Sequence, residues 1–238
     1  MLVTLVVLRF QLPHACLAVL FGVDRATITR AVHQIRPLLA ARGFRTPEGP
    51  RLRTLADVFA YANQHGVRLR IDGTEIQVRR PKPGRSGRRA FVSGKKKQNT
   101  MKFTMITSHT GRVLWAGAPR PGRMHDQTAV RTEGIAEQLR LYPNVRVLVD
   151  AGYRGLVNEY PDQVIGPPKR PTRTAVPEDV TEFERARKAQ SSKRISVEHG
   201  IAEAKAWRPL QRWIGKRDHL PETLAAIASL ASDRVRTA

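Results

Sequence analysis

The chain has 238 residues and is 41% hydrophobic, which suffices for one catalytic domain with a small appendage and excludes a disordered tail. Its 42 Lys and Arg against 20 Asp and Glu give a formal charge of +22, which indicates a polyanionic partner such as nucleic acid; a ribosomal-type protein or a plain arginine bias is the alternative. The single cysteine, Cys16, excludes a disulfide framework and a thiolate zinc site.

The first 41 residues are predicted to be helical. Residues 1–8 are apolar, but Arg9, Gln11 and His14 interrupt them well short of the ~20 apolar residues that span a bilayer. We therefore expect a cytoplasmic protein with no membrane partner.

A helix-turn-helix pattern lies within this helical segment. Residues 14–21 are followed by the turn Gly22-Val23-Asp24 and by a second helix from residue 25 to 35. The second helix would present side chains that can reach base edges or phosphates in a major groove: Arg25, Thr27, Thr29 and Arg30. An ordinary helical hairpin with polar outer residues is the alternative.

A Gly/Pro/Arg-rich connection and a short helix at residues 55–64 come next. The periodicity then changes to two, because Val67, Leu69 and Ile71 alternate with polar residues, which predicts a strand that reaches Asp72. Residues 79–97 are dense in Lys, Arg, Gly and Pro and form either a solvated excursion or an arm that tracks phosphates. We favour the arm, whose candidate DNA contacts are Arg88, Arg89, Lys95, Lys96 and Lys97.

The rest of the chain alternates strands and helices. The expected order is a hairpin of residues 99–108 and 112–117, a helix at 127–141, a buried strand at 145–149, a short strand at 163–165, helices at 178–190 and 194–207, and a last helix from Pro221. A three-stranded meander followed by alternating strands and helices predicts an α/β domain with a mixed sheet.

Two acidic residues stand at the ends of predicted strands. Asp72 precedes Gly73, and Asp150 precedes Ala151 and Gly152. If the two strands are neighbours, their carboxylates share one sheet edge, and two hard carboxylates there would need a hard cation such as Mg²⁺ or Mn²⁺. The alternative is that both are turn residues, since Asp-Gly is a common turn sequence.

A third carboxylate is selected by helical periodicity. At 100° per residue, Arg194, Glu198 and Lys205 fall within about 60° of one another, whereas Glu203 points about 140° away. Glu75 lies on the opposite face of its strand from Asp72. Three carboxylates suffice for a site with two metal ions, and Arg194 and Lys205 would neutralise phosphate charge beside it, with plain helix-surface solvation as the alternative.

Four segments resemble the bacterial insertion-sequence transposases of the DDE superfamily, in the branch akin to Harbinger transposases: RIDGTE, HTGRVLWAGAPRPGRMHD, VLVDAGYRG and RISVEHGIAEAK. The resemblance covers nearly the whole chain. It implies a ribonuclease H-like fold, a bacterial and nucleoid-associated protein, and metal-binding aspartates at Asp72 and Asp150.

The family's third acid stands in a signature of Tyr, Arg, Glu and Lys. Arg194, Glu198 and Lys205 match its spacing, and Ser191 replaces the tyrosine. The family's Gly-x-x-His-Asp stretch is matched by His125 and Asp126, with a chemical or a structural role open.

The sequence thus predicts a helix-turn-helix segment at residues 1–50 and a ribonuclease H-like catalytic domain at residues 51–238. The expected activity is that of a DNA transposase or endonuclease that uses two Mg²⁺ or Mn²⁺ ions to cut and rejoin double-stranded DNA at element ends and target, as a homo-oligomer. The alternatives are a silent DNA-binding regulator derived from a transposase and a metal nuclease without strand transfer, or a ribonuclease. Because relatives carry more sequence before the helix-turn-helix, a 5′-truncated copy with weakened end recognition is a further expectation.

Overall fold

Three helices form the N-terminal part of the chain. The computed structural model describes residues 1–47, 49–82, 87–172 and 174–233, without the side chains of residues 192–197. The three helices are α1 (Leu2–Phe10), α2 (His14–Phe21) and α3 (Arg25–Ala41). The turn between α2 and α3 depends on Gly22, whose φ of 62° lies in the left-handed region that glycine adopts without strain. The predicted helix-turn-helix is confirmed.

A mixed sheet lies at the centre of the molecule, with its main strands in the order β3-β2-β1-β5-β6. β1 pairs antiparallel with β2 and parallel with β5, and β5 pairs parallel with β6. The strands are β1 (Leu69–Val78), β2 (Thr100–Ser108), β3 (Val113–Ala116), β4 (Arg120–Pro121), β5 (Val147–Leu148), β6 (Val164–Ile165) and β7 (Arg212–Trp213). This arrangement confirms the expected α/β class and is consistent with a ribonuclease H-like fold.

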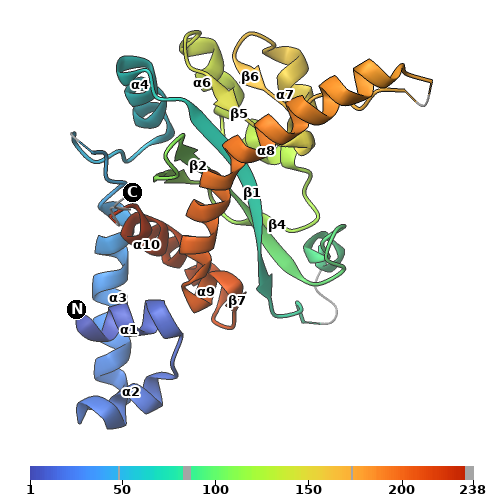
Figure 1. Ribbon diagram of the computed structural model, residues 1–238. Coiled ribbons are helices and arrows are strands. Elements are labelled where there is room, and N and C mark those ends of the chain that lie inside the picture. The colour runs from blue at the N-terminus through green and yellow to red at the C-terminus, as the bar shows by residue number, and fades with distance from the viewer. Residues whose placement is uncertain (48, 83–86, 173, 234–238) are drawn as a thin grey trace.

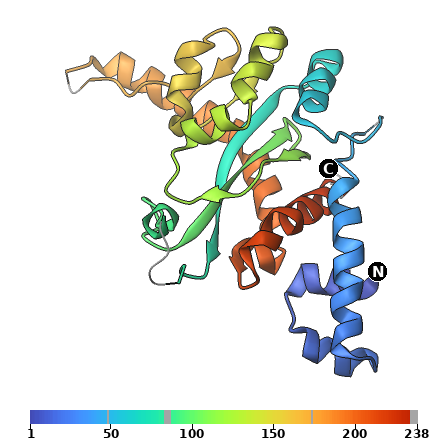
Figure 2. The same ribbon diagram turned by 180° about the vertical axis from the view of Figure 1, so that it is seen from behind.

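Helices cover both faces of the sheet (Figures 1 and 2). One face carries α4 (Leu55–His65), α5 (Asp126–Thr132), α6 (Ile135–Leu141) and α7 (Arg154–Glu159). The other carries α8 (Pro177–Lys205), α9 (Arg208–Gln211) and α10 (Leu220–Ser232). Short 3-10 helices are η1 (Arg88–Phe91), η2 (Ala151–Tyr153) and η3 (Arg217–His219).

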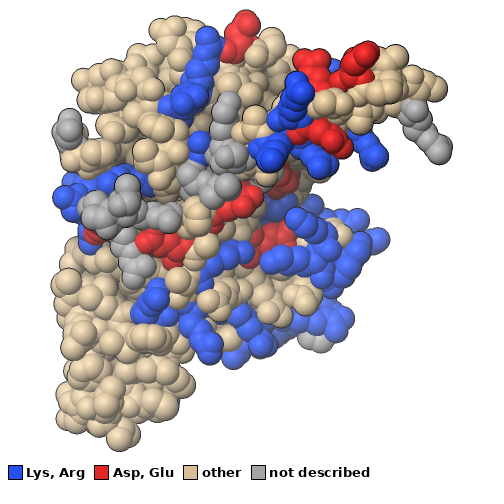
Figure 3. Space-filling view, in the orientation of Figure 1, with Lys and Arg blue, Asp and Glu red and all other residues tan. Residues whose placement is uncertain are grey.

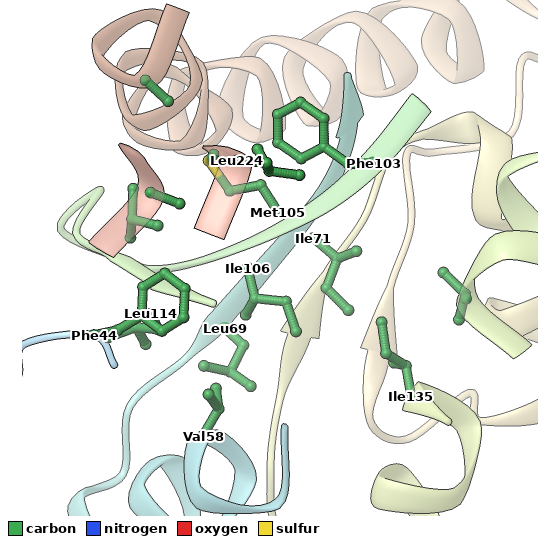
Figure 4. Packing of buried hydrophobic residues seen from close by; sticks show 14 of the residues in the cluster. Phe44, Val58, Leu69, Ile71, Phe103, Met105, Ile106, Leu114, Ile135 and Leu224 are labelled. Carbon is green, nitrogen blue, oxygen red and sulfur yellow. The ribbon is translucent and has the colours of Figure 1, made fainter. Parts of the chain in front are cut away.

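The core follows from the alternation of side chains along β1 and β2. Leu69, Ile71 and Ile106 are buried toward α4 and α6, whereas Phe103 and Met105 are buried toward α10 (Figure 4). Asp72 pairs with Met105 and therefore belongs to the face that α8 and α10 cover. The sheet thus has two packed faces and places Asp72 below α8.

Two predicted elements differ from the structure. Residues 178–207 were expected to form two helices but form the single helix α8, because neither Gly nor Pro stands between residues 178 and 199. The predicted helix at 127–141 is divided into α5 and α6 at Gly134, whose φ is 79°.

The N-terminal helices dock on the C-terminal helix α10. Arg36 of α3 forms an ion pair with Glu222, and Arg42 pairs with Asp233 at the end of α10. Arg51 reaches the same Asp233 carboxylate at 2.6 Å. The predicted division at residue 50 stays a prediction. No helix of the described chain is long and apolar enough to cross a bilayer.

Candidate active site

One edge of β1 is open along its middle. β5 pairs with β1 only at Leu69 and Arg70, and β7 pairs with it only at Gln77 and Val78. Arg70 and Leu148 form the last pair of β1 with β5, and Asp72 and Asp150 each follow two residues later. Because adjacent strands lie about 5 Å apart, the two aspartates stand side by side where β1 and β5 separate.

Backbone amides orient both aspartates. Asp72 Oδ1 accepts a hydrogen bond of 2.8 Å from the Gly73 amide, and Asp150 Oδ1 accepts one of 2.8 Å from the Gly152 amide. Both carboxylates line a cleft of about 350 Å³, which we call the acidic cleft. The predicted pairing of Asp72 with Asp150 at one sheet edge therefore agrees with their positions.

Asp126 is a third carboxylate in the acidic cleft. It begins α5 and forms an ion pair of 2.7 Å with Lys102 of β2, whose side chain is 12% exposed. Lys102 also donates to the Met124 carbonyl at 2.9 Å. The Lys102 ammonium held at this point offsets part of the repulsion among the three aspartates.

Two glycines allow Asp126 to approach the other aspartates. A Cβ atom on Gly73 would lie 3.0 Å from Asp126 Oδ1, and one on Gly152 would lie 2.9 Å from Asp126 Oδ2. The hydroxyl of buried Tyr153 would lie 3.1 Å from the same Cβ atom on Gly73. Burial raises the pKa of Tyr153 well above its ordinary value, and the carboxylates of Asp126, Asp72 and Asp150 raise it further. The glycines of the Asp-Gly and Asp-Ala-Gly sequences therefore leave room for the Asp126 carboxylate, besides any role in turning the chain.

His125 stands beside Asp126 and also lines the acidic cleft. It is the N-cap residue of α5, and its Nδ1 accepts a hydrogen bond from the Gln127 amide at 3.4 Å. Gly122 of the same motif lies against Thr100, where a Cβ atom would overlap the threonine side chain. The Gly-x-x-His-Asp stretch thus directs Asp126 into the acidic cleft.

Part of the basic arm closes one side of the acidic cleft. Buried Ser93 donates to Glu75 Oε1 at 3.0 Å, and Gly94 and Lys95 line the cleft. Glu75 lines it as well, although the strand alternation places its side chain on the other face from Asp72. On the face drawn in Figure 3, Lys and Arg side chains surround a smaller group of acidic ones near the middle.

Lys205 of α8 reaches the edge of β1 beside the acidic cleft, although it is not among the residues that line the cleft. Its Nζ donates to the Glu75 carbonyl at 3.2 Å, on the open edge of β1. Burial and the Lys96 ammonium lower the pKa of Lys205, whereas the Glu75 and Asp72 carboxylates act in the opposite direction. Lys205 therefore lies near both Asp72 and Lys96, and two neighbouring cations favour an anion.

Glu198 is exposed on α8 and is not among the residues that line the acidic cleft. It precedes Lys205 by seven residues, about two turns of helix, so both lie on the same side of α8. Arg194 is helical, but its side chain lies outside the described residues. The structure thus brings Asp72 and Asp150 together. Glu198 lies outside the acidic cleft, on the side of α8 that also carries Lys205.

The acidic cleft suits a divalent cation in the chemistry of its donors. Asp72 and Asp150 offer hard carboxylate oxygens oriented by backbone amides, which Mg²⁺ and Mn²⁺ prefer. Among the described side chains, no three Asp, Glu, His or Cys residues have the mutual spacing of a formed metal site. The two aspartates therefore fit such an ion in the chemistry of their donor atoms.

The proposed DNA-contacting residues of α3 differ in exposure. Arg25, Thr27 and Arg30 are exposed, and Arg30 donates to the Thr27 hydroxyl at 3.2 Å. Thr29 is half-buried: its hydroxyl donates to the Arg25 carbonyl and lies 2.9 Å from His14 Nδ1. Ile28 and Val32 form the buried side of α3. The outer face of α3 therefore presents two arginines and a threonine.

The arm residues lie between the ends of β1 and β2. Arg89, Lys95, Lys96 and Lys97 are exposed, and Arg88 is half-buried. η1 is fixed by Arg217, whose guanidinium carbon lies 4.4 Å from the Phe91 ring centre. The predicted arm thus contains a folded segment that borders the acidic cleft through Lys95.

Sequence reasoning did not assign Asp126 and Lys102 to the site. Asp126 was noticed through the Gly-x-x-His-Asp stretch, but its role stayed open. Lys102 carries no motif. The register of β2 against β1 places it opposite Glu75, which only the pairing of the strands reveals.

Comparisons with known proteins agree with this geometry. The family described as DDE superfamily endonuclease matches residues 71–232, and the helix-turn-helix of DDE superfamily endonuclease matches residues 1–45. The chain is similar to a "Probable transposase for insertion sequence element IS702" of Microchaete diplosiphon, with 25% identity over 138 residues. That match covers 57% of this chain and 45% of the relative, so the chain spans less than half of the relative's length. No solved structure matches the chain significantly.

Proposed function

Because the chain belongs to the DDE superfamily endonucleases, we propose that it is a transposase, which binds the terminal inverted repeats of an insertion sequence, cuts the DNA and joins its ends to a target. The observation that carries this proposal is the meeting of Asp72 and Asp150 at the open edge of β1, within a chain of charge +22. The match to a protein named as a probable transposase supports strand transfer over simple nuclease activity.

Asp72 and Asp150 would hold divalent metal, Mg²⁺ or Mn²⁺, with Glu198 of α8 as the third ligand. Two such ions, when bound, would activate a water or a 3′-hydroxyl and stabilise the leaving oxygen at phosphorus. The position of Glu198 supports its assignment as a ligand. It lies on the same side of α8 as Lys205, and Lys205 contacts the edge of β1.

The cations around the acidic cleft would position the phosphodiester. Lys95 lines the cleft and Lys205 lies at the adjoining edge of β1, so both would offer ammonium groups to phosphate oxygens, and Arg194 would add a bidentate donor. Lys102 is already paired with Asp126, so its role is to hold that carboxylate in place. The chain thus supplies orientation and charge to the DNA strand.

DNA binding is assigned to two surfaces. The exposed face of α3, with Arg25, Thr27 and Arg30, would enter a major groove, as second helices of this motif do. The arm, with Arg88, Arg89 and Lys95 to Lys97, would follow the backbone near the acidic cleft. We also propose a DNA-binding segment at residues 1–50 and a catalytic domain at residues 51–238. The protein would act at the nucleoid as a homo-oligomer that pairs two element ends.

The test is nicking of DNA that carries the element ends, in Mg²⁺ or Mn²⁺. The wild-type chain should cut at the element boundaries, and Asp150→Asn should abolish cutting while DNA binding persists. Asp162→Asn, a control that removes an exposed carboxylate outside the acidic cleft, should cut like wild type. If Asp150→Asn cuts like wild type, the site assignment is wrong; if wild type binds tightly and never cuts, the protein is a DNA-binding regulator.

A further inference from the structure

A second cavity lies next to the acidic cleft and shares none of its lining residues. Its volume is about 390 Å³, within the range of about 300–1,000 Å³ typical of small-molecule sites. It lies where the first residues of β1 and β5 approach β6, and α8, which crosses the sheet, forms one wall (Figure 1). We call it the basic cavity, after its polar lining of Arg68, Arg70, His109, Arg146 and Gln190.

Two buried donors of the basic cavity have no hydrogen-bond partner among the described residues. They are Nη1 of Arg70 and Nε2 of Gln190. Gln190 is only 8% exposed, although Ala186 and Ala189 of the same helix are exposed. An unpaired buried donor costs about 1–3 kcal/mol, so both donors point to an acceptor that a ligand supplies.

Positive charge gathers at the basic cavity without a counterion. Arg68, His109 and Arg146 are exposed at its rim, and no described residue of its lining is acidic. Burial, Arg68 and Arg70 lower the pKa of His109. Cations crowded in this way favour an anion, and guanidinium groups match phosphate oxygens in geometry.

Part of the wall of the basic cavity is apolar. It includes Leu148, Pro168 and Ile165, which is 47% exposed. A bare phosphate would leave this wall in water, whereas a phosphate that carries a ring would cover it. We infer that the basic cavity binds one nucleotide of a DNA strand, with its phosphate on Arg70, Arg68 and Arg146 and its base against the apolar wall, where the Gln190 amide donates to it.

The position of the cavity connects it to the acidic cleft. Arg70 and Asp72 lie on the same face of β1, two residues and therefore about 7 Å apart. A strand that is cut at Asp72 can thus place a nearby nucleotide in the basic cavity, and this step rests on the proposed function. Gln190 and Glu198 belong to the same helix, so a bound nucleotide would also hold α8 across the sheet.

The experiment compares the binding of two DNA probes to the full chain without divalent metal, so that no cleavage occurs. One probe is a duplex with a short single-stranded tail, and the other is the same duplex with blunt ends. Wild type should prefer the tailed duplex about tenfold, the equivalent of one charge-assisted hydrogen bond. Arg70→Met and Gln190→Leu should lose the preference, as should the rim variants Arg68→Ala and Arg146→Ala, which remove exposed side chains and spare the fold. Arg140→Ala, which removes an exposed arginine of α6, should keep it.

Each result decides the proposal. Equal affinity of wild type for both probes, or a preference that survives in all four variants, would overturn it. If free thymidine monophosphate or inorganic phosphate competes as strongly as the tailed duplex, the ligand is not part of a DNA strand. Nicking in Mg²⁺ is measured on the same preparations: intact nicking without a tail preference refutes the cavity alone, and a tail preference without nicking refutes the proposed function alone.

Discussion

Replacement of Glu133 by glutamine should change how the stability of the protein depends on pH. Glu133 ends α5 and lies against β2 and β3, where a Cβ atom on Gly117 would overlap its carboxylate. Burial raises the pKa of Glu133 from 4.5 to about 7, and nearby Thr104 and Arg120 offset only part of this rise. The folded state therefore prefers the protonated carboxyl.

The magnitude follows from the difference between the folded and unfolded pKa. Below pH 4.5 both states hold the proton, and Glu133 carries no penalty. Between pH 4.5 and about 7 the unfolded state releases the proton first, so the free energy of unfolding falls as the pH rises. Each pKa unit corresponds to about 1.4 kcal/mol, so the loss above pH 7 reaches at most about 3 kcal/mol.

The assay is urea unfolding followed by tryptophan fluorescence at pH 5 and pH 8. Glu133→Gln should be more stable than wild type at pH 8, by up to about 3 kcal/mol, and close to wild type at pH 5. Glu137→Gln, which removes an exposed carboxylate of the next helix, should show no such dependence. The reasoning is refuted if Glu133→Gln changes stability equally at both pH values or is less stable than wild type at pH 8.

Three further predictions concern the acidic cleft and α3. Gly152→Ala should lower the free energy of unfolding by about 1–3 kcal/mol, because its Cβ would lie 2.9 Å from Asp126 Oδ2. The control Gly94→Ala, which has open space around its Cβ position, should unfold like wild type. Equal urea midpoints for Gly152→Ala and wild type would contradict this prediction. Lys102→Met should lower the free energy of unfolding by about 1–3 kcal/mol in the same assay. The double variant Lys102→Met/Asp126→Asn should regain most of this stability. If the effects of the two substitutions are additive instead, the Lys102–Asp126 ion pair does not contribute to stability. Arg25→Ala should weaken binding to element-end DNA about tenfold in a gel-shift titration, and unchanged affinity would remove α3 from the DNA interface.

The sequence allowed the sheet and its two aspartates to be predicted. Leu69 and Ile71 alternate with polar residues, and residues 145–149 form an apolar run. Each pattern predicts a buried strand from the residues of a single short segment, so neither prediction requires knowledge of the fold. The adjacency of Asp72 and Asp150 then followed from one assumption, that the two strands are neighbours, and the register of β1 and β5 agrees with it.

The remaining parts of the site depend on contacts between distant segments. Asp126 reaches the cleft because α5 starts beside Gly73 and Gly152, and Lys102 because β2 pairs with β1 in one register. Periodicity predicts that Glu198 lies on the side of α8 that carries Lys205. It could not give the distance of that side from the sheet, which depends on how α8 packs.

The most direct test of the account is the binding of Mn²⁺ to the full chain, measured by electron paramagnetic resonance of the free ion. The wild-type protein should bind Mn²⁺, and Asp72→Asn and Asp150→Asn should each weaken binding at least about tenfold, since each removes a hard ligand. Asp162→Asn should bind like wild type. Unchanged Mn²⁺ affinity in both cleft variants would contradict the claim that Asp72 and Asp150 hold the metal.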